Sequence, residues 1–195
     1  MGKIIKSPYI IGISGNMGSG KSTLSKALSV ALNATLISWD DFDDISVGPD
    51  DYVEWYKKGQ DYGAWNYQTL ADCLQNLKSE KAVIHPVFKT VLNPTEFIIF
   101  DAPLGRLHIQ TGTYIDTWIH LDVPLDVSLC RWLIRDFKNS DRTKDDLMEE
   151  IEFYVTSSRP LFIDEEMKQK ADLIVNGMLP VNEEVENILR CINEK

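Results

Sequence analysis

Short apolar runs recur along the chain, and most of them lack the polar–apolar alternation of a strand with one wet face. Such runs are typical of strands buried on both faces of a sheet. We expect strands at residues 9–14, 35–38, 81–84, 97–101, 117–121 and 172–175. The stretches between them predict helices over residues 21–32, 49–58, 67–78, 124–138, 143–158 and 181–193.

This order of elements predicts an α/β fold in which a parallel sheet carries helices on both faces. Right-handed crossovers then place the loops that follow the strands along one edge of the sheet, where such folds bind ligands. No internal repeat or low-complexity tract divides the chain, so we expect a single domain over residues 1–195. The chemistry is therefore expected at the carboxyl ends of the strands.

The segment after the first strand reads Gly-Asn-Met-Gly-Ser-Gly-Lys-Ser, a complete GxxxxGKS phosphate-binding loop. Its glycines let the backbone curl so that N–H groups face a phosphate chain, and the next helix adds a favourable dipole. Lys21 can reach the β and γ oxygens, and the Ser22 hydroxyl can ligate Mg²⁺. We expect ATP to be bound by Gly15, Asn16, Met17, Gly18, Ser19, Gly20, Lys21, Ser22 and Thr23.

Carboxylates follow two of the other predicted strands. Asp40 comes directly after the second strand, and Asp101 ends the apolar run at residues 97–101. Phosphoryl transfer to a hydroxyl needs a carboxylate that orients the hydroxyl and can accept its proton, which is the role expected of Asp40. Carboxylates can also hold Mg²⁺ directly or through water, a role open to Asp40 and Asp101 together with Ser22. The alternatives are a solvated acidic turn and a core strand that ends in a helix-capping aspartate.

Two arginines, Arg131 and Arg135, are four residues apart in a predicted helix and so lie on one face of it. Such a pair can clamp transferring phosphates as a site closes. The polar segment beyond them would be the tip of a lid. The alternative is an ordinary surface helix in which Arg135 pairs with a nearby acid.

The chain resembles the uridine kinase and nicotinamide riboside kinase group of P-loop kinases over roughly residues 9–190. The resemblance rests on the order of five segments: residues 15–22, Ser38-Trp39-Asp40-Asp41-Phe42, residues 97–101, Arg131-x-x-x-Arg135-Asp136 and residues 171–174. It implies a three-layer α/β/α fold with a five-stranded parallel sheet, a lid at about 131–145 and a substrate-side insertion at about 46–90. Within that insertion, residues 81–89 are expected to form a strand pair.

The same resemblance implies roles for single residues. It gives Lys21, Asp40, Arg131 and Arg135 catalytic roles, the arginines by contact with ATP phosphates. It matches Ser22 and the acid that ends the apolar run, here Asp101, to the Mg²⁺ ligands. It favours Asp40 over its neighbour Asp41 as the carboxylate that receives the acceptor hydroxyl.

Several positions depart from the family pattern. Asp101-Ala102 stands where the family has Glu-Gly, and Trp132 where a second adjacent lid arginine is common. Asn66 stands where relatives carry an aspartate that grips ribose hydroxyls, and Phe88 replaces an aromatic hydroxyl. We expect the acceptor to contact Asp40, Trp65, Asn66 and Phe88. The nearby aromatic residues fit stacking on a planar ligand and packing of the insertion equally well.

Composition and charge narrow the class of protein. The chain has 195 residues, 44% of them hydrophobic, and a net charge of −10. This charge disfavours broad binding to nucleic-acid backbones, because the protein would repel phosphates. Its three cysteines show no metal or disulfide spacing, and no run resembles a signal peptide or a membrane span, so a cytoplasmic protein is expected. The oligomeric state stays open.

We therefore expect an ATP- and Mg²⁺-dependent kinase that moves the γ-phosphate to a hydroxyl of a small, nucleoside-like metabolite. One alternative is a kinase for a non-nucleoside acceptor such as a cofactor precursor. Another is a nucleotide-binding regulator without turnover, which the departures at Asp101, Trp132 and Asn66 would favour.

Overall fold

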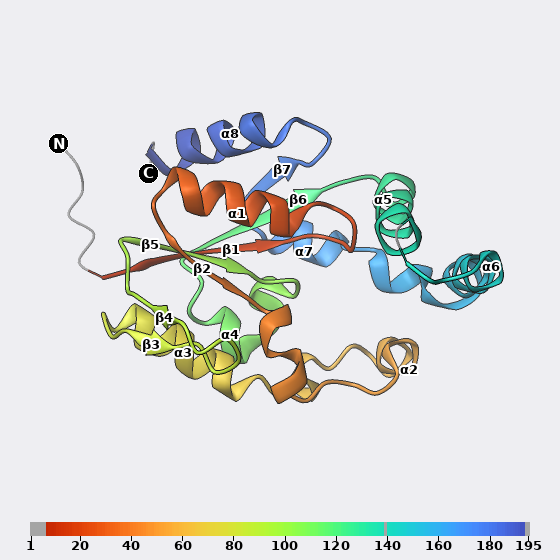
Figure 1. The fold of residues 1–195 in the computed structure, drawn as a ribbon, viewed down its shortest axis with the longest axis horizontal. Coiled ribbons are helices and arrows are strands. Elements are labelled where there is room, and N and C mark those ends of the chain that lie inside the picture. The colour runs from red at the N-terminus through yellow and green to blue at the C-terminus, as the bar shows by residue number, and fades with distance from the viewer. Residues whose placement is uncertain (1–6, 139, 194–195) are drawn as a thin grey trace.

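Five parallel strands form the central sheet of the computed structural model, which describes residues 7–138 and 140–193 (Figure 1). The sheet order is β2-β5-β1-β6-β7, which confirms the predicted parallel α/β sheet. The central strand β1 has Ile10, Ile11 and Ile13 wholly buried, as its run without alternation predicts. The strands are β1 (Tyr9–Ser14), β2 (Thr35–Ser38), β5 (Phe97–Asp101), β6 (Thr117–Asp122) and β7 (Leu173–Asn176).

Helices cover both faces of the sheet (Figure 1). On one face lie α1 (Lys21–Ala31) and α8 (Val181–Asn193), which pack Leu24, Leu28 and Ile188 into one apolar cluster. On the other face lie α3 (Gln68–Lys78), α4 (Ile109–Gly112) and α7 (Glu165–Lys170) over a second cluster that includes Trp118. The sequence analysis missed α4 and α7, because helices this short carry too few residues for a periodic signal.

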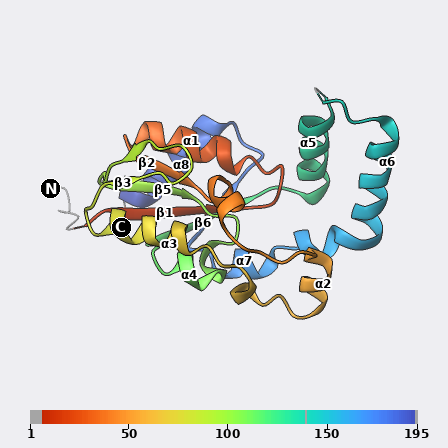
Figure 2. The ribbon, with the colours of Figure 1, turned by 60° about the horizontal axis from the view of Figure 1, so that its bottom comes forward.

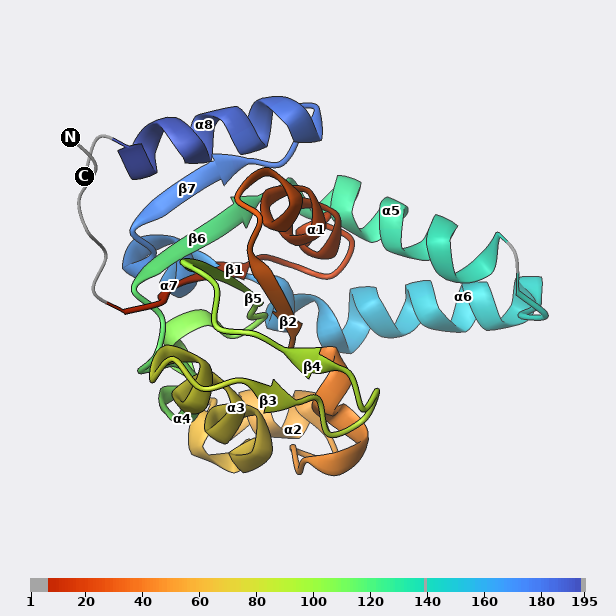
Figure 3. The ribbon, with the colours of Figure 1, turned by 60° about the vertical axis from the view of Figure 1, so that its left-hand side comes forward.

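A helical arm, residues 125–162, stands away from the sheet (Figures 2 and 3). It consists of α5 (Leu125–Phe137) and the antiparallel α6 (Lys144–Phe153), followed by a π-helical turn (Tyr154–Ser158) and a 3₁₀ turn (Arg159–Phe162). The arm contains the predicted lid at about 131–145, of which Asn139 lies outside the described residues. Within residues 7–138 and 140–193, no helix has the length and apolar content to cross a membrane.

The segment between β2 and β5 contains the expected insertion at about 46–90. It contains α2 (Tyr52–Lys57), α3 and a small antiparallel pair, β3 (Val83–Ile84) and β4 (Val91–Leu92). The expected strand pair at 81–89 is therefore wrong in its second half, because that strand lies beyond Lys89. Residues 85–90 form the turn between the two strands. In it, Lys89 has a φ of 58°, and the His85 N–H donates to the Thr90 carbonyl at 2.7 Å.

Candidate active site

The phosphate loop, residues 15–22, leaves the carboxyl end of β1 and runs into the first turn of α1. Gly15, Gly18 and Gly20 have φ values of 152°, 77° and 102°, a region that side chains disfavour. A Cβ at Gly18 would also lie 2.0 Å from the carbonyl oxygen of Ser128 on α5. The loop glycines are thus required both by the curl of the backbone and by the close approach of the arm.

Lys21 points back into this curl. Its Nζ donates to the carbonyl oxygen of Asn16 at 3.1 Å. Burial lowers the pKa of Lys21, and the nearby carboxylates of Asp101 and Asp40 only partly oppose this effect. In the same loop, the Ser19 hydroxyl is buried and has no hydrogen-bond partner among the described residues. A lysine whose charge is only partly balanced by nearby carboxylates, and a serine hydroxyl without a partner, both lie in this curled loop. These features fit a bound phosphate chain.

Ser22 and Asp101 meet beside the loop. The Ser22 hydroxyl donates to Asp101 Oδ2 at 2.7 Å, and Asp101 is 4% exposed at the end of β5. Burial raises the pKa of Asp101, although Lys21 and the Ser22 hydrogen bond oppose the rise. Mg²⁺ is usually held by one or two protein oxygens together with substrate phosphates. Ser22 and Asp101 can supply the protein oxygens. Within the described part of the chain, no cluster of three or more His, Cys, Asp or Glu residues is suited to a metal ion.

The acidic turn, a 3₁₀ segment at Asp40–Ile45, follows β2 and separates the roles of its aspartates. Asp43 accepts a hydrogen bond from the Tyr67 hydroxyl at 2.7 Å, and Asp41 Oδ2 lies 3.6 Å from His85 Nε2. Asp40 is exposed and lies close enough to raise the pKa of Lys21 electrostatically. Asp40 is therefore near the phosphate-binding lysine, whereas Asp41 and Asp43 have partners in the insertion, although the charge of Asp41 also raises the pKa of Asp101.

His85 is a member of this region that the sequence analysis did not single out. It is 3% exposed and lies at the start of the turn between β3 and β4. Its Nδ1 accepts hydrogen bonds from the N–H groups of Val87 and Phe88, both at 3.3 Å, so Nε2 carries the proton that faces Asp41. Phe88, expected to contact substrate, is 59% exposed and stacks on the His85 ring at 4.6 Å. Sequence spacing could not reveal the Asp41–His85 contact, which joins distant segments.

Asn66 and Trp65 lie on the insertion and contact residues just beyond the two ends of the acidic turn. The Asn66 backbone pairs with Val47, and its Oδ1 accepts from Gln110 Nε2 at 3.2 Å, which leaves the amide N–H₂ as its free donor among the described residues. Trp65 packs edge-on against Trp39 at 6.1 Å, and its indole N–H is buried without a partner in the described chain. Trp39 itself is 4% exposed and stacks on the Tyr67 ring at 3.9 Å, which favours packing of the insertion for this residue.

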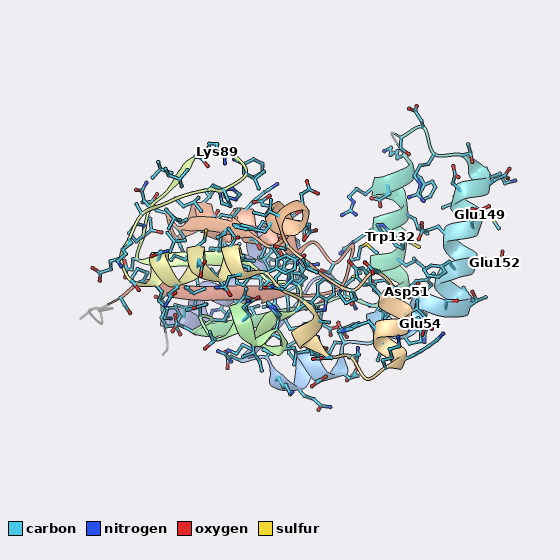
Figure 4. All side chains as sticks on the ribbon, turned by 90° about the horizontal axis from the view of Figure 1, so that it is seen from below. Asp51, Glu54, Lys89, Trp132, Glu149 and Glu152 are labelled. Atoms are coloured by element: carbon cyan, nitrogen blue, oxygen red, sulfur yellow. The ribbon has the colours of Figure 1, made fainter. Side chains whose placement is uncertain are left out.

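The two arm arginines diverge although they share one face of α5. Arg131 Nη1 donates to the carbonyl oxygens of Gly177 at 3.2 Å and Ser19 at 3.5 Å. Arg135 lies close enough to lower the pKa of Lys21, and its Nε donates to Asp136 at 2.7 Å. Trp132 lies between the two arginines in the sequence, and Figure 4 shows it on α5, with Glu149 and Glu152 on α6. Of these two arginines, Arg135 is the one whose charge lowers the pKa of Lys21.

Residues 10–183 match the family model described as the phosphoribulokinase / uridine kinase family. The uridine kinase of Clostridium botulinum strain Kyoto / Type A2 is 28% identical over 97% of this chain and 100% of its own length. That of Saccharomyces cerevisiae is 30% identical over 96% of this chain, which spans only 40% of the yeast protein. These sequence matches cover nearly all of the fold described above.

Solved structures agree on the fold. A putative fructose transport system kinase from Silicibacter sp. TM1040 superposes with a TM-score of 0.59 over 89% of this chain and 92% of that chain, at 18% identity. The phosphate loop, the parallel sheet and the sequence matches together identify an ATP-dependent phosphotransferase that acts on a hydroxyl. The chain belongs to the phosphoribulokinase / uridine kinase family of P-loop kinases.

Proposed function

We propose that this protein transfers the γ-phosphate of ATP to a hydroxyl of a nucleoside-like small molecule. The observation that supports this most strongly is the placement of Asp40. Of the three aspartates at 40, 41 and 43, it is the one whose charge raises the pKa of Lys21, whereas Asp41 and Asp43 have side-chain partners in the insertion. A carboxylate in that place can align an acceptor hydroxyl with a phosphate held by the loop and can receive its proton.

The other groups of the site have complementary tasks. Lys21 and the loop N–H groups hold the phosphates, and Arg135 adds positive charge as the arm approaches. Ser22 and Asp101 would hold Mg²⁺, which supplies charge neutralisation on the phosphate oxygens. Arg131, already bonded to Gly177, supports the nucleotide from the β7 side of the loop.

The acceptor is proposed to bind over the acidic turn, between Asn66 and the turn that carries Phe88. Several carboxylates in this region, Asp40, Asp41 and Asp43 among them, disfavour an anionic acceptor. Hydroxyl-bearing neutral or cationic molecules fit better, and the relatives named uridine kinase make a ribonucleoside the first candidate. The free Asn66 amide can donate to a sugar hydroxyl, without the charge assistance of a carboxylate.

Two rival functions remain in view. A non-nucleoside acceptor, such as a cofactor precursor, keeps the same transfer chemistry but not the ribose contact at Asn66. A regulator without turnover would bind nucleotide and transfer nothing. The pairing of Asp136 with Trp132, where a second arginine is common in relatives, is the feature that favours it.

The test is ATP consumption with a panel of nucleosides, nicotinamide riboside and vitamin-like alcohols, run on the wild type, Lys21→Ala and Asn66→Asp. We expect turnover with at least one nucleoside, and its near loss in Lys21→Ala, because a positioned cation contributes several kcal/mol at a transferring phosphate. Asn66→Asp should lower KM for a nucleoside several-fold, by about 1 kcal/mol, and leave KM for ATP unchanged.

Each rival predicts a different result in the same panel. Turnover only with non-nucleoside alcohols would reject the nucleoside assignment and keep the kinase. Nucleotide binding without turnover on any acceptor would favour the regulator. A folded Lys21→Ala variant with normal ATP affinity and rate would reject the loop assignment.

A further inference from the structure

The side chain of Asn16 points away from the phosphate loop, toward the end of the arm. Its Nδ2 donates to the Phe162 carbonyl at 2.9 Å and to Asp164 Oδ2 at 3.0 Å. Both partners are acceptors, so the orientation of the amide is fixed. On its other side, the Asn16 carbonyl accepts the Lys21 ammonium at 3.1 Å. One residue thus links the phosphate-binding lysine to the segment where the arm returns to the sheet.

Asp164, the charged partner of Asn16, is itself held firmly. It is 9% exposed, and its Oδ2 also accepts from His120 Nε2 at 2.8 Å. Its Oδ1 lies 3.1 Å from Lys168 Nζ. Although burial alone would raise the pKa of Asp164, the bonds from His120 and Lys168 hold it below its usual value. The carboxylate is therefore an ionised, fixed anchor rather than a loose surface group.

The neighbouring loop residues contact both legs of the arm. Met17 lines a small pocket with Leu129 of α5 and with Tyr154 and Phe162 of the returning segment. Gly18 leaves no room for a side chain against the Ser128 carbonyl. Residues 16–18 therefore contact both ends of the arm, and the Asn16 amide supplies the polar contact to its C-terminal end.

We propose that Asn16 is a positioning residue whose side chain couples nucleotide binding at the phosphate loop to the position of the arm. A change in the loop when Lys21 leaves the Asn16 carbonyl for a phosphate is passed through the amide to Phe162 and Asp164. The arm thereby brings Arg135 to the transferring group. This proposal rests on nucleotide binding at the loop, which the experiment below reads separately.

Hydrogen exchange tests the coupling, with and without a non-hydrolysable Mg·ATP analogue. In the wild type, the analogue should slow exchange at residues 15–22 and also at residues 160–168. In Asn16→Ala, the first response should persist because the loop N–H groups remain. The second should be lost, and exchange at 160–168 should become about 10-fold faster or more, because the hydrogen bonds to the Asp164 carboxylate and to the Phe162 carbonyl are both removed.

Two further variants make the result specific. Lys168→Met removes the donor on the opposite oxygen of Asp164 and does not touch Asn16, so it should keep the nucleotide response at 160–168. Asp164→Asn removes the charge of this acceptor and keeps the Asn16 bond to the Phe162 carbonyl, so it should reduce the nucleotide response at 160–168 less than Asn16→Ala does, and the double variant should match Asn16→Ala. If Asn16→Ala fails to fold, Asp164→Asn carries the comparison alone.

Kinetics separate positioning from simple loss of structure. Asn16→Ala should lower kcat about 10-fold and change KM for ATP less than about 3-fold, because the lost interaction acts on the arm and not on ground-state binding. The coupling is overturned if folded Asn16→Ala keeps the nucleotide response at 160–168. It is also overturned if residues 15–22 respond in the wild type and residues 160–168 do not. No response at 15–22 rejects the proposed nucleotide site and the coupling with it.

Discussion

Replacing Asp40 by asparagine is the most direct test of the proposed chemistry, because the structure supplies its own controls. Three aspartates lie within four positions, and two of them have partners in the insertion: Asp41 with His85, and Asp43 with Tyr67. The Asp40 side chain makes no hydrogen bond to any residue in the described part of the chain, and its charge acts on Lys21. The amide has the same shape as the carboxylate but cannot take a proton from an acceptor hydroxyl.

The expected loss follows from that single difference. A positioned general base contributes about 10²- to 10⁴-fold, so Asp40→Asn should lower kcat by ~10²-fold or more, equivalent to at least about 2.7 kcal/mol. The ground-state affinity for ATP should not fall. Removing a negative charge near the phosphates relieves some repulsion, so KM for ATP should stay equal or drop by less than about 3-fold.

The assay is steady-state kinetics with ATP and the acceptor varied separately, on Asp40→Asn, Asp41→Asn and Asp43→Asn. Asp41→Asn should keep kcat within about 3-fold, because its charge serves a contact with the hairpin outside the transfer itself. Asp43→Asn should show mainly a lower free energy of unfolding through the weakened Tyr67 bond. If Asp41→Asn is the damaging change and Asp40→Asn is mild, the placement of the catalytic carboxylate is wrong.

Three further outcomes follow from the same geometry. Burial holds the pKa of Lys21 below its ordinary value of 10.5, so the unfolded chain binds more protons than the folded one, and the free energy of unfolding should rise as pH rises toward 10.5. In thermal melts, Lys21→Met should raise the Tm of the nucleotide-free protein, remove that pH dependence and abolish the rise in Tm that ATP gives. Arg135→Ala should lower kcat more than Arg131→Ala, which should chiefly raise KM for ATP, as steady-state kinetics can show. Tyr67→Phe should lower the free energy of unfolding in urea by about 1–2 kcal/mol, whereas Tyr52→Phe, with its ring exposed, should cost less than about 0.5 kcal/mol.

The sheet and the phosphate loop could be predicted from the sequence because their signals are local. A strand buried on both faces reads as an apolar run without alternation, as residues 9–13 of β1 and 97–100 of β5 show. The loop needs glycines where φ is positive, at Gly15, Gly18 and Gly20, and those positions are part of the motif itself. A short strand such as β4, only two residues long, carries no comparable signal.

The partners of the site residues could not be predicted, because they depend on segments that meet only in the fold. The Asn16 amide reaches a carbonyl 146 positions away in the chain. Helical spacing correctly places Arg131 and Arg135 on one side of α5. It cannot say that Arg131 finds the Gly177 carbonyl while Arg135 approaches Lys21. Long side chains bond to acceptors on loops that are distant in the sequence, and neither hydrophobic periodicity nor composition predicts which loops these are.

The electrostatics of the phosphate loop explain why the arm and the nucleotide should favour one another. Without a phosphate, Arg135 and Lys21 are like charges, and the approach of Arg135 lowers the pKa of Lys21 further. The protein as a whole has a net charge of −10, so the affinity for an anion must come from these few local cations. A phosphate chain between Lys21 and Arg135 turns their repulsion into two attractions. The ligand that the loop binds should then also attract the arm, and in the coupling proposed above the contact of Asn16 with Asp164 links the two.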